Sequence, residues 1–182
     1  VTGALEVTGA EVPAGQYTLS EIAPAGYDPS DWLCVGGTVA GAVVTVPVGG
    51  NVTCTITNDD IAPKLTLIKQ VTNDNGGTAD AGDWTLTASG PVIATGVTGG
   101  DQVTAAAVDA GDYNLSESGG PAGYAAGNWA CVGGELNGAV LTLELAEEAT
   151  CTIINDDIAP RLTLIKNVIN DIAPEPWFRD KY

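Results

Sequence analysis

The chain has 182 residues, enough for one or two domains, and carries six Lys and Arg against 23 Asp and Glu, with no His. The net charge of −17 argues against nucleic acids and anionic membranes as partners, because both require a positive protein surface. No apolar run is long enough to insert into a membrane.

Gly, Thr, Val and Ala dominate, which favours short strands joined by turns. Between residues 64 and 160, strands are predicted at 64–71, 83–88, 91–95, 102–106, 111–117, 128–132, 140–145 and 149–155. Residues 72–82 are predicted to form a loop. The sequence shows no helical period. The expected fold is all-β, a tandem series of antiparallel β-sandwich domains of the prealbumin or immunoglobulin type.

The sequence repeats itself with a period of 97 residues. The stretch Asn58-Asp59-Asp60-Ile61-Ala62-Pro63 returns 97 positions later, from Asn155 to Pro160. Such self-similarity predicts a tandem array. The divisions are an incomplete repeat at 1–63 that lacks its first strands, a complete repeat at 64–160, and the first strand or strands of a following repeat at 161–182. The sequence starts without Met and without a signal sequence, so we expect a processed product or a piece of something longer.

A polar residue ends an inward apolar stripe in three predicted strands. Alternate side chains of a strand lie on one face, so Lys69 points the same way as Leu65 and Leu67. A buried ammonium without a partner is too costly to be accidental. The other two stripes are Tyr113-Leu115-Glu117 and Cys151-Ile153-Asn155.

Two interpretations of this constellation stay open. In one, Lys69 and Glu117 form a buried ion pair that Asn155 joins by a hydrogen bond, an arrangement that is at best weakly stabilising. In the other, the desolvated lysine becomes a nucleophile and attacks the Asn155 side chain, while the carboxylic acid polarises the carbonyl and shuttles protons. That reaction expels ammonia and removes the buried charge.

The four cysteines form two pairs with the same spacing, Cys34 with Cys54 and Cys131 with Cys151. They are either free core thiols or disulfides within each repeat. The matched spacing favours disulfides, and disulfides indicate an oxidising, extracellular setting.

Residues 17–27 resemble the signature of the Cna protein B-type domains, which are also called SpaA-like or prealbumin-like. That signature is a Tyr-x-Leu-x-Glu strand followed by Pro-x-Gly-Tyr. It is present from Tyr17 to Tyr27 and again, one residue longer, from Tyr113 to Tyr124. The Trp-x-Cys…Cys pattern resembles tandem repeats of secreted actinobacterial proteins.

Domains of this family build stalks and pili on the surface of Gram-positive bacteria, and a first-strand lysine joins a last-strand Asn or Asp through an isopeptide bond. The signature glutamate assists that reaction. The resemblance implies an isopeptide bond between Lys69 and Asn155 with Glu117 as the assisting acid. It also marks Lys166, Asn58 and Glu21 as members of incomplete sets.

These incomplete sets complement each other. One account is that the chain is a window on a longer array. The other is that residues 161–182 of one subunit insert into the open first unit of the next, which builds a head-to-tail homopolymer. Lys166 then meets Asn58 and Glu21 of the neighbour, and Trp177-Phe178 stand in for Trp84.

The expected function is that of a structural extracellular filament or stalk subunit. An adhesin that recognises host protein or carbohydrate is the alternative. We expect no turnover enzyme and no cofactor, because isopeptide formation is a single self-directed event. Calcium is a weaker option at acidic clusters near the domain junctions, against solvated turns; these clusters are Asn58-Asp59-Asp60, Asn155-Asp156-Asp157, Asn73-Asp74-Asn75 and Asp80 with Asp83.

Overall fold

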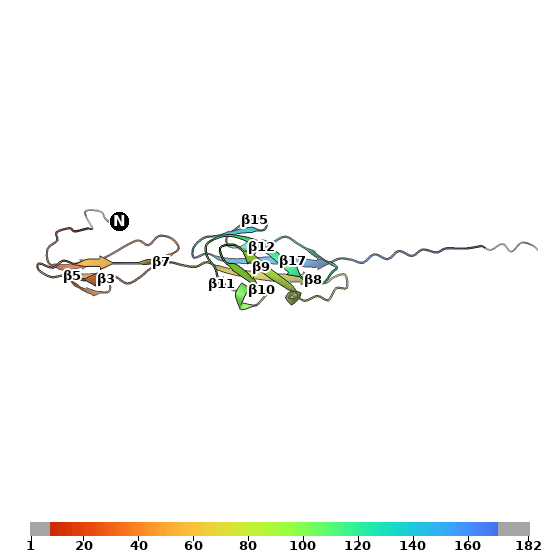
Figure 1. Cartoon of the computed structure of the whole chain (residues 1–182), viewed down its shortest axis with the longest axis horizontal. Coiled ribbons are helices and arrows are strands. Elements are labelled where there is room, and N and C mark those ends of the chain that lie inside the picture. Colours follow the sequence, from red (N-terminus) through yellow and green to blue (C-terminus); the bar gives the residue numbers. More distant parts are fainter. Residues whose placement is uncertain (1–7, 171–182) are drawn as a thin grey trace, which may run out of the picture.

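Strands make up most of the regular structure in residues 8–170, the part of the chain that this computed structural model describes. Two short 3-10 turns, η1 (Ala81–Asp83) and η2 (Asp101–Val103), are the only helical elements in that range. The strands fall into two groups that lie one after the other along an elongated molecule (Figure 1). Strands β1 to β7 pair only among themselves, as do strands β8 to β17.

The second group forms two five-stranded layers. One sheet has the order β10 (Ile93–Gly96), β9 (Trp84–Ser89), β12 (Gly111–Gly119), β16 (Val140–Leu143) and β15 (Glu135–Asn137). The other has the order β11 (Ala106–Ala107), β8 (Lys64–Thr72), β17 (Glu148–Asp157) and β13 (Tyr124–Ala126), with β14 (Ala130–Val132) also paired to β17.

One pairing departs from the predicted antiparallel arrangement. Strands β8 and β17 are parallel, with Lys64 opposite Glu148 and Lys69 opposite Ile153. The first and last strands of this group therefore run side by side in the same direction. This pairing brings Lys69 and Asn155 onto neighbouring strands.

The core lies between the two sheets and follows the alternation of their strands. Leu65 and Leu67 of β8 are fully buried, as are Leu86 of β9, Tyr113 of β12 and Leu141 of β16. Intervening residues on these strands are mostly half-buried or exposed. This is the pattern expected for sheets with one face in the core.

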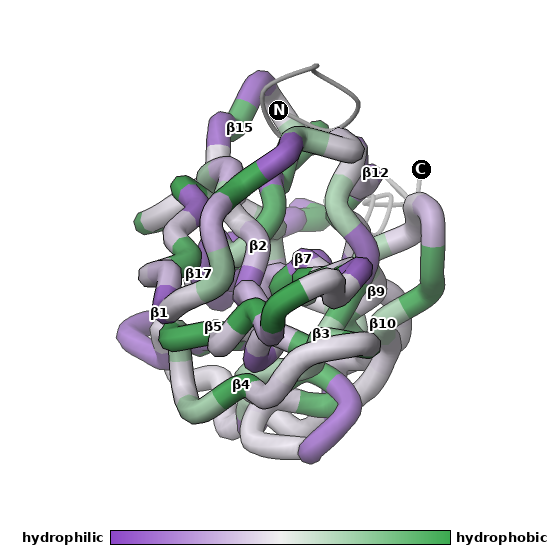
Figure 2. The backbone as a smooth tube through the Cα atoms, turned by 90° about the vertical axis from the view of Figure 1, so that its left-hand side faces the viewer, coloured by the Kyte–Doolittle hydropathy of each residue, from purple (hydrophilic) through white to green (hydrophobic). Residues whose placement is uncertain are grey.

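The first group of strands has no comparable core. It consists of three small sheets, β1 (Gly15–Thr18) with β5 (Val43–Val46) and β4 (Thr38–Ala40), β2 (Tyr27–Pro29) with β7 (Asn58–Asp60), and β3 (Leu33–Val35) with β6 (Thr53–Thr55). Figure 2 views the molecule from this end. Among residues 8–62, Val44 alone is buried. The strand that would correspond to β8 is absent from these described residues, so the inner face is incomplete.

Three details differ from the sequence-based strand assignment. The predicted strand at 102–106 is wrong, because η2 and a positive φ of 48° at Ala105 bend the backbone there. Strands β13 and β15 were not predicted; each has three residues between glycine-containing turns. Residues 161–170 form no strand and are exposed, extending away from β17 (Figure 1).

Candidate functional site

The predicted lysine lies in the interior of the second strand group. Lys69 on β8 is 2% exposed, and its Nζ lies 2.5 Å from Oε2 of Glu117. Nζ also lies 4.7 Å from the ring centroid of Trp84, within the range of a cation–π contact. The ammonium thus has one carboxylate partner and one aromatic face, and the Lys69 side chain is shielded from solvent.

Glu117 joins the other two predicted residues. Its Oε1 accepts a hydrogen bond of 2.7 Å from Nδ2 of Asn155, while Oε2 contacts Lys69. Glu117 reaches across from β12 in one sheet to β8 and β17 in the other. The structure therefore brings all three residues together, as the alternation of their strands predicted.

The carboxamide of Asn155 is oriented by one of its two polar atoms only. Asn155 is 3% exposed, and its Oδ1 is buried without a hydrogen-bond partner among the described residues. Leaving a buried acceptor unpaired typically costs about 1–3 kcal/mol. A reaction at the Asn155 carboxamide would therefore break no hydrogen bond to Oδ1.

An open groove leads to the carboxylate. A cavity of about 640 Å³ is lined by Glu117 together with Trp129, Leu136 and Ile153. The Glu117 side chain is 13% exposed, whereas that of Lys69 is fully buried. A small neutral molecule formed at the site would have a short route to solvent along this groove.

The first strand group contains two members of the second predicted set. Nδ2 of Asn58 lies 3.3 Å from Oε2 of Glu21, and Oδ1 of Asn58 is buried without a partner in the described part of the chain. Lys166 lies apart from them, exposed in the extended segment 161–170. The same Asn–Glu contact thus occurs in both groups, but with a lysine only in the second.

Both predicted disulfides are present. Cys34 pairs with Cys54 across β3 and β6, and Cys131 pairs with Cys151 across β14 and β17. In each case the two cysteines are directly opposite each other in an antiparallel register. The equal spacing of twenty residues reflects the same pair of strands in both groups.

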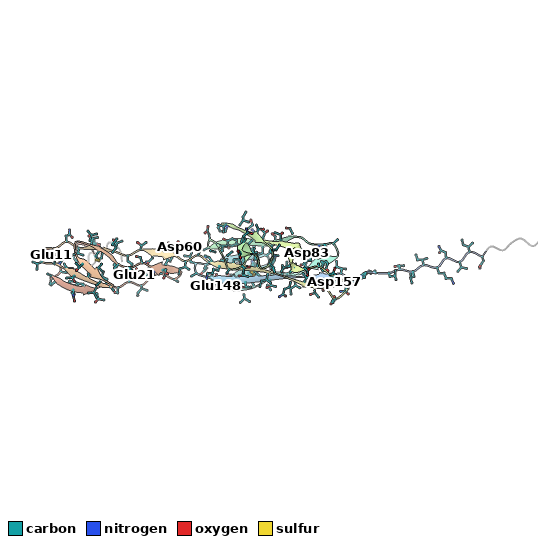
Figure 3. The ribbon with its side chains drawn as sticks, turned by 90° about the horizontal axis from the view of Figure 1, so that it is seen from below. Glu11, Glu21, Asp60, Asp83, Glu148 and Asp157 are labelled. Carbon is teal, nitrogen blue, oxygen red and sulfur yellow. A yellow bond between two sulfur atoms is a disulfide. The ribbon has the colours of Figure 1, made fainter. Side chains whose placement is uncertain are left out.

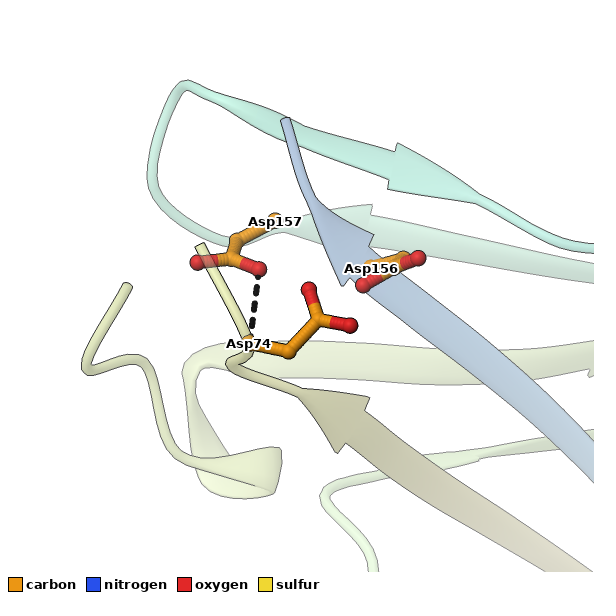
Figure 4. A group of neighbouring side chains, drawn as sticks. All are labelled: Asp74, Asp156 and Asp157. Atoms are coloured by element: carbon orange, nitrogen blue, oxygen red, sulfur yellow. Dashed lines mark hydrogen bonds between the residues drawn. The ribbon is translucent and has the colours of Figure 1, made fainter. Parts of the chain in front are cut away.

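The acidic cluster around Asp157 has a role that the sequence did not reveal. Asp74, Asp156 and Asp157 lie close enough to share a cation (Figure 4). However, the buried Asp157 carboxylate already accepts hydrogen bonds from the backbone N–H groups of Asp74, Asn75 and Gly77. These donors make Asp157 an anchor for the loop that follows β8.

These contacts also set the charge state of Asp157. Burial alone raises the pKa of its carboxyl, but the hydrogen bonds from the backbone N–H groups of Gly77, Asn75 and Asp74 outweigh burial and hold the pKa below its ordinary value. Extending the alternation of β17 two residues beyond Asn155 would have marked Asp157 as inward-facing.

Comparison with known families bears on the whole chain. The prealbumin-like fold domain family, of the SpaA type, matches residues 1–56 and 60–153. The chain belongs to this family. No curated protein and no solved structure matches it.

The prealbumin-like assignment agrees with the β-sheet architecture and is that of a structural fold. Domains of the SpaA-like type serve as pilin and surface-protein modules and are typical of the surface of Gram-positive bacteria. No helix within residues 8–170 is long and apolar enough to cross a membrane.

Proposed function

We propose that this chain is a structural subunit of an extracellular filament or stalk, strengthened by isopeptide bonds and by its disulfides. The observation that carries the proposal is the position of Glu117, which contacts both Lys69 and Asn155 in a buried site. A carboxyl group held between an amine and a carboxamide has the geometry needed to transfer protons between them.

The proposed reaction joins Lys69 to Asn155. Glu117 takes a proton from the Lys69 ammonium, and the free Nζ attacks Cγ of Asn155. The Nζ–Cγ bond forms and the Cγ–Nδ2 bond breaks, while the now neutral Glu117 relays that proton to Nδ2. Glu117, ionised again, then takes the second proton from Nζ and ends the reaction as a neutral carboxylic acid. The products are a secondary amide and ammonia, so atoms and charge balance. Ammonia leaves by the groove beside Trp129.

The energetics of burial favour this outcome. Lys69 is charged and buried before the reaction and part of a neutral amide afterwards, so the desolvation penalty of a buried ion pair is removed. The unpartnered Oδ1 of Asn155 becomes the carbonyl oxygen of the new amide.

The test is the intact mass in denaturant of a chain that carries Lys166→Met, so that only the bond within the second strand group can form. We expect its mass to be lower than that of its sequence by one ammonia, beyond the hydrogens lost to disulfides. Adding Lys69→Met or Glu117→Gln should restore the full mass of the sequence. Lys64→Met is the matched control, because Lys64 lies on the same strand with an exposed side chain. A full mass in the Lys166→Met parent would refute the bond.

We further propose that residues 161–169 of one subunit complete the first strand group of another. By the 97-residue period, 161–169 correspond to β8, and 51–59 correspond to the part of β17 that pairs with β8. The segment exposes the apolar side chains of Leu162, Leu164, Ile165, Val168 and Ile169. Strand addition to an open edge would bury alternate members of this set and satisfy the backbone.

In that parallel register Lys166 lies opposite Ile56, as Lys69 lies opposite Ile153. Asn58 and Glu21 are already in contact in the acceptor. We propose that Lys166 reacts with Asn58 of the neighbour, with Glu21 as the assisting acid. The predicted contribution of Trp177-Phe178 falls outside the described residues.

Electrophoresis in denaturant with reductant tests the covalent filament. We expect a ladder of multimers from the unchanged chain and from Lys69→Met, and monomer alone from Lys166→Met. A collapse of the unchanged chain to monomer would refute the bond between subunits. Electron microscopy of the unchanged chain should show unbranched fibres, because head-to-tail contacts that do not close generate filaments.

A further inference from the structure

The two strand groups are joined by a short, hydrogen-bonded joint. The Ile61 N–H donates to the Gly26 carbonyl at 2.9 Å, which fixes the linker to the first group. The Ile61 carbonyl accepts from the Ala146 N–H at 2.8 Å, and the Lys64 N–H donates to the Glu147 carbonyl at 2.8 Å. The linker is thus tied to both sides, with Asp60 and Glu148 nearby (Figure 3).

Side-chain packing also holds the joint together. Gly26 has a φ of 80°, and a Cβ placed on it would lie 2.5 Å from Cβ of Leu145. Leu145 therefore packs directly on the backbone of the first group, in the turn that also contains Ala146. That turn is tight, because Ala146 has a positive φ of 61°.

Each half of this joint occurs a second time, at the outer end of one strand group, where no partner half within residues 8–170 contacts it. The Ile158 N–H donates to the Gly123 carbonyl at 2.8 Å, as Ile61 does to Gly26. A Cβ on Gly123 would meet nothing within 4 Å, and Ile158 is 61% exposed. This end therefore has the backbone hydrogen bond of the Gly26–Ile61 half, but no described residue packs on Gly123 as Leu145 packs on Gly26.

The opposite end carries the other half. By the 97-residue period, Val48 and Gly49 correspond to Leu145 and Ala146. Gly49 has a φ of 67°, close to that of Ala146, and Val48 is 92% exposed. The Gly50 N–H closes this turn on the Pro47 carbonyl at 3.0 Å, as the Glu147 N–H closes the other turn on the Glu144 carbonyl at 3.3 Å.

We infer that the Val48–Gly49 turn of one copy docks on Gly123 and Ile158 of a second copy, in the geometry of the internal joint. Val48 packs on the Gly123 backbone, and the Gly49 N–H donates to the Ile158 carbonyl. This inference rests on the proposed head-to-tail assembly and adds an interface separate from the donated strand. It makes each contact between copies a repetition of the contact within a copy.

One element of the internal joint is not repeated. Lys64 and Glu148 form an ion pair of 3.1 Å there, with exposed side chains. The corresponding residues between copies are Arg161 and Asn51. Exposed ion pairs typically contribute about 0–1 kcal/mol, so this replacement leaves the joint essentially intact.

The test measures reversible association of the chain in a Lys166→Met background by sedimentation equilibrium. Val48→Asp places a charge against Gly123, and we expect it to weaken association about ten-fold or more. Ile93→Asp is the matched control, because Ile93 is 69% exposed on β10 and lies outside both halves of the joint. It should leave association unchanged.

A peptide of residues 161–170 carrying Lys166→Met separates the joint from the donated strand, because it has neither Gly123 nor Ile158. Its affinity should be the same for the Val48→Asp chain and its parent, which also shows that the first strand group remains intact. Equal association of the Val48→Asp and parent chains would overturn the joint and leave strand donation standing. A loss of peptide affinity in Val48→Asp would overturn it too.

If the peptide binds neither chain but association still depends on Val48, strand donation fails and the joint stands. If neither the peptide nor the parent chain associates, both are overturned.

Discussion

The Lys69 side chain is fully buried. Its replacement by an apolar residue can therefore distinguish an ion pair from a crosslink. Replacing a buried ion pair with apolar groups is often neutral, although a lone partner charge left behind is costly. A crosslink between positions 69 and 155 restricts the unfolded chain as well, as a disulfide across a loop of that size does, by about 4–5 kcal/mol.

We therefore predict that the double variant Lys69→Met, Glu117→Leu loses about 4 kcal/mol of unfolding free energy. It removes both charges at once, so no unpaired ion remains. Denaturant unfolding followed by tryptophan fluorescence gives the measurement, because Trp84 and Trp129 both lie in the second strand group. Stability equal to that of the unchanged chain would indicate an ion pair alone.

Asp157 makes the stability of the loop after β8 depend on acid. The pKa of its carboxyl is lower in the folded chain than its ordinary value of 3.8. Its stabilising contribution is therefore fully present above that value and is lost as the pH falls through the folded pKa. Near neutral pH the loop should be unaffected by small changes in pH.

We predict that Asp157→Asn lowers the unfolding midpoint at pH 7 and reduces the difference between midpoints at pH 7 and pH 2. Thermal unfolding at a series of pH values is the measurement. Asp156→Asn is the neighbouring control, since Asp156 is exposed on the same strand. An equal effect of both variants would show that net charge, and not the loop contacts, sets the acid dependence.

At the scale of strands, alternation of side chains predicted more than propensity did. It placed Lys69, Glu117 and Asn155 on inner faces, and the structure buries Lys69 and Asn155 and half-buries Glu117. It did not predict that β8 and β17 pair in parallel, because alternation fixes a face and not a partner. The short β13 and β15 were missed because three residues are too few to show a period.

Strand β14 offers a test at this scale. It has three residues, and Cys131 attaches it covalently to Cys151 on β17. Replacing both cysteines with Ala should cost about 3 kcal/mol, as expected for a loop of this size. Amide hydrogen exchange at Ala130–Val132 should accelerate. The same change at Cys34 and Cys54 should leave exchange on β14 unaffected, and a matching acceleration there would contradict a local role.

At the scale of the whole molecule, an elongated chain presents acidic side chains along its length (Figure 3). The net charge of −17 means that copies repel one another. The proposed contacts between copies are apolar or between backbone groups, with no ion pair at Arg161 and Asn51. Attraction is therefore insensitive to salt, while repulsion is screened by it.

We predict that association of the Lys166→Met chain strengthens when salt is raised from about 0.01 M to about 0.15 M, because the Debye length falls from about 30 Å to about 8 Å. Sedimentation equilibrium at the two salt concentrations is the measurement. The Lys166→Met peptide of residues 161–170 is the control: it is cationic through Arg161 and carries no acidic residue, so its affinity for the acidic chain should fall over the same range. The whole chain and the peptide bind the same edge of the first strand group. Opposite salt dependences would therefore show that the charge of the whole molecule, and not the edge itself, causes the repulsion. Association of the chains that weakens with salt would instead show that ion pairs between copies hold the filament together.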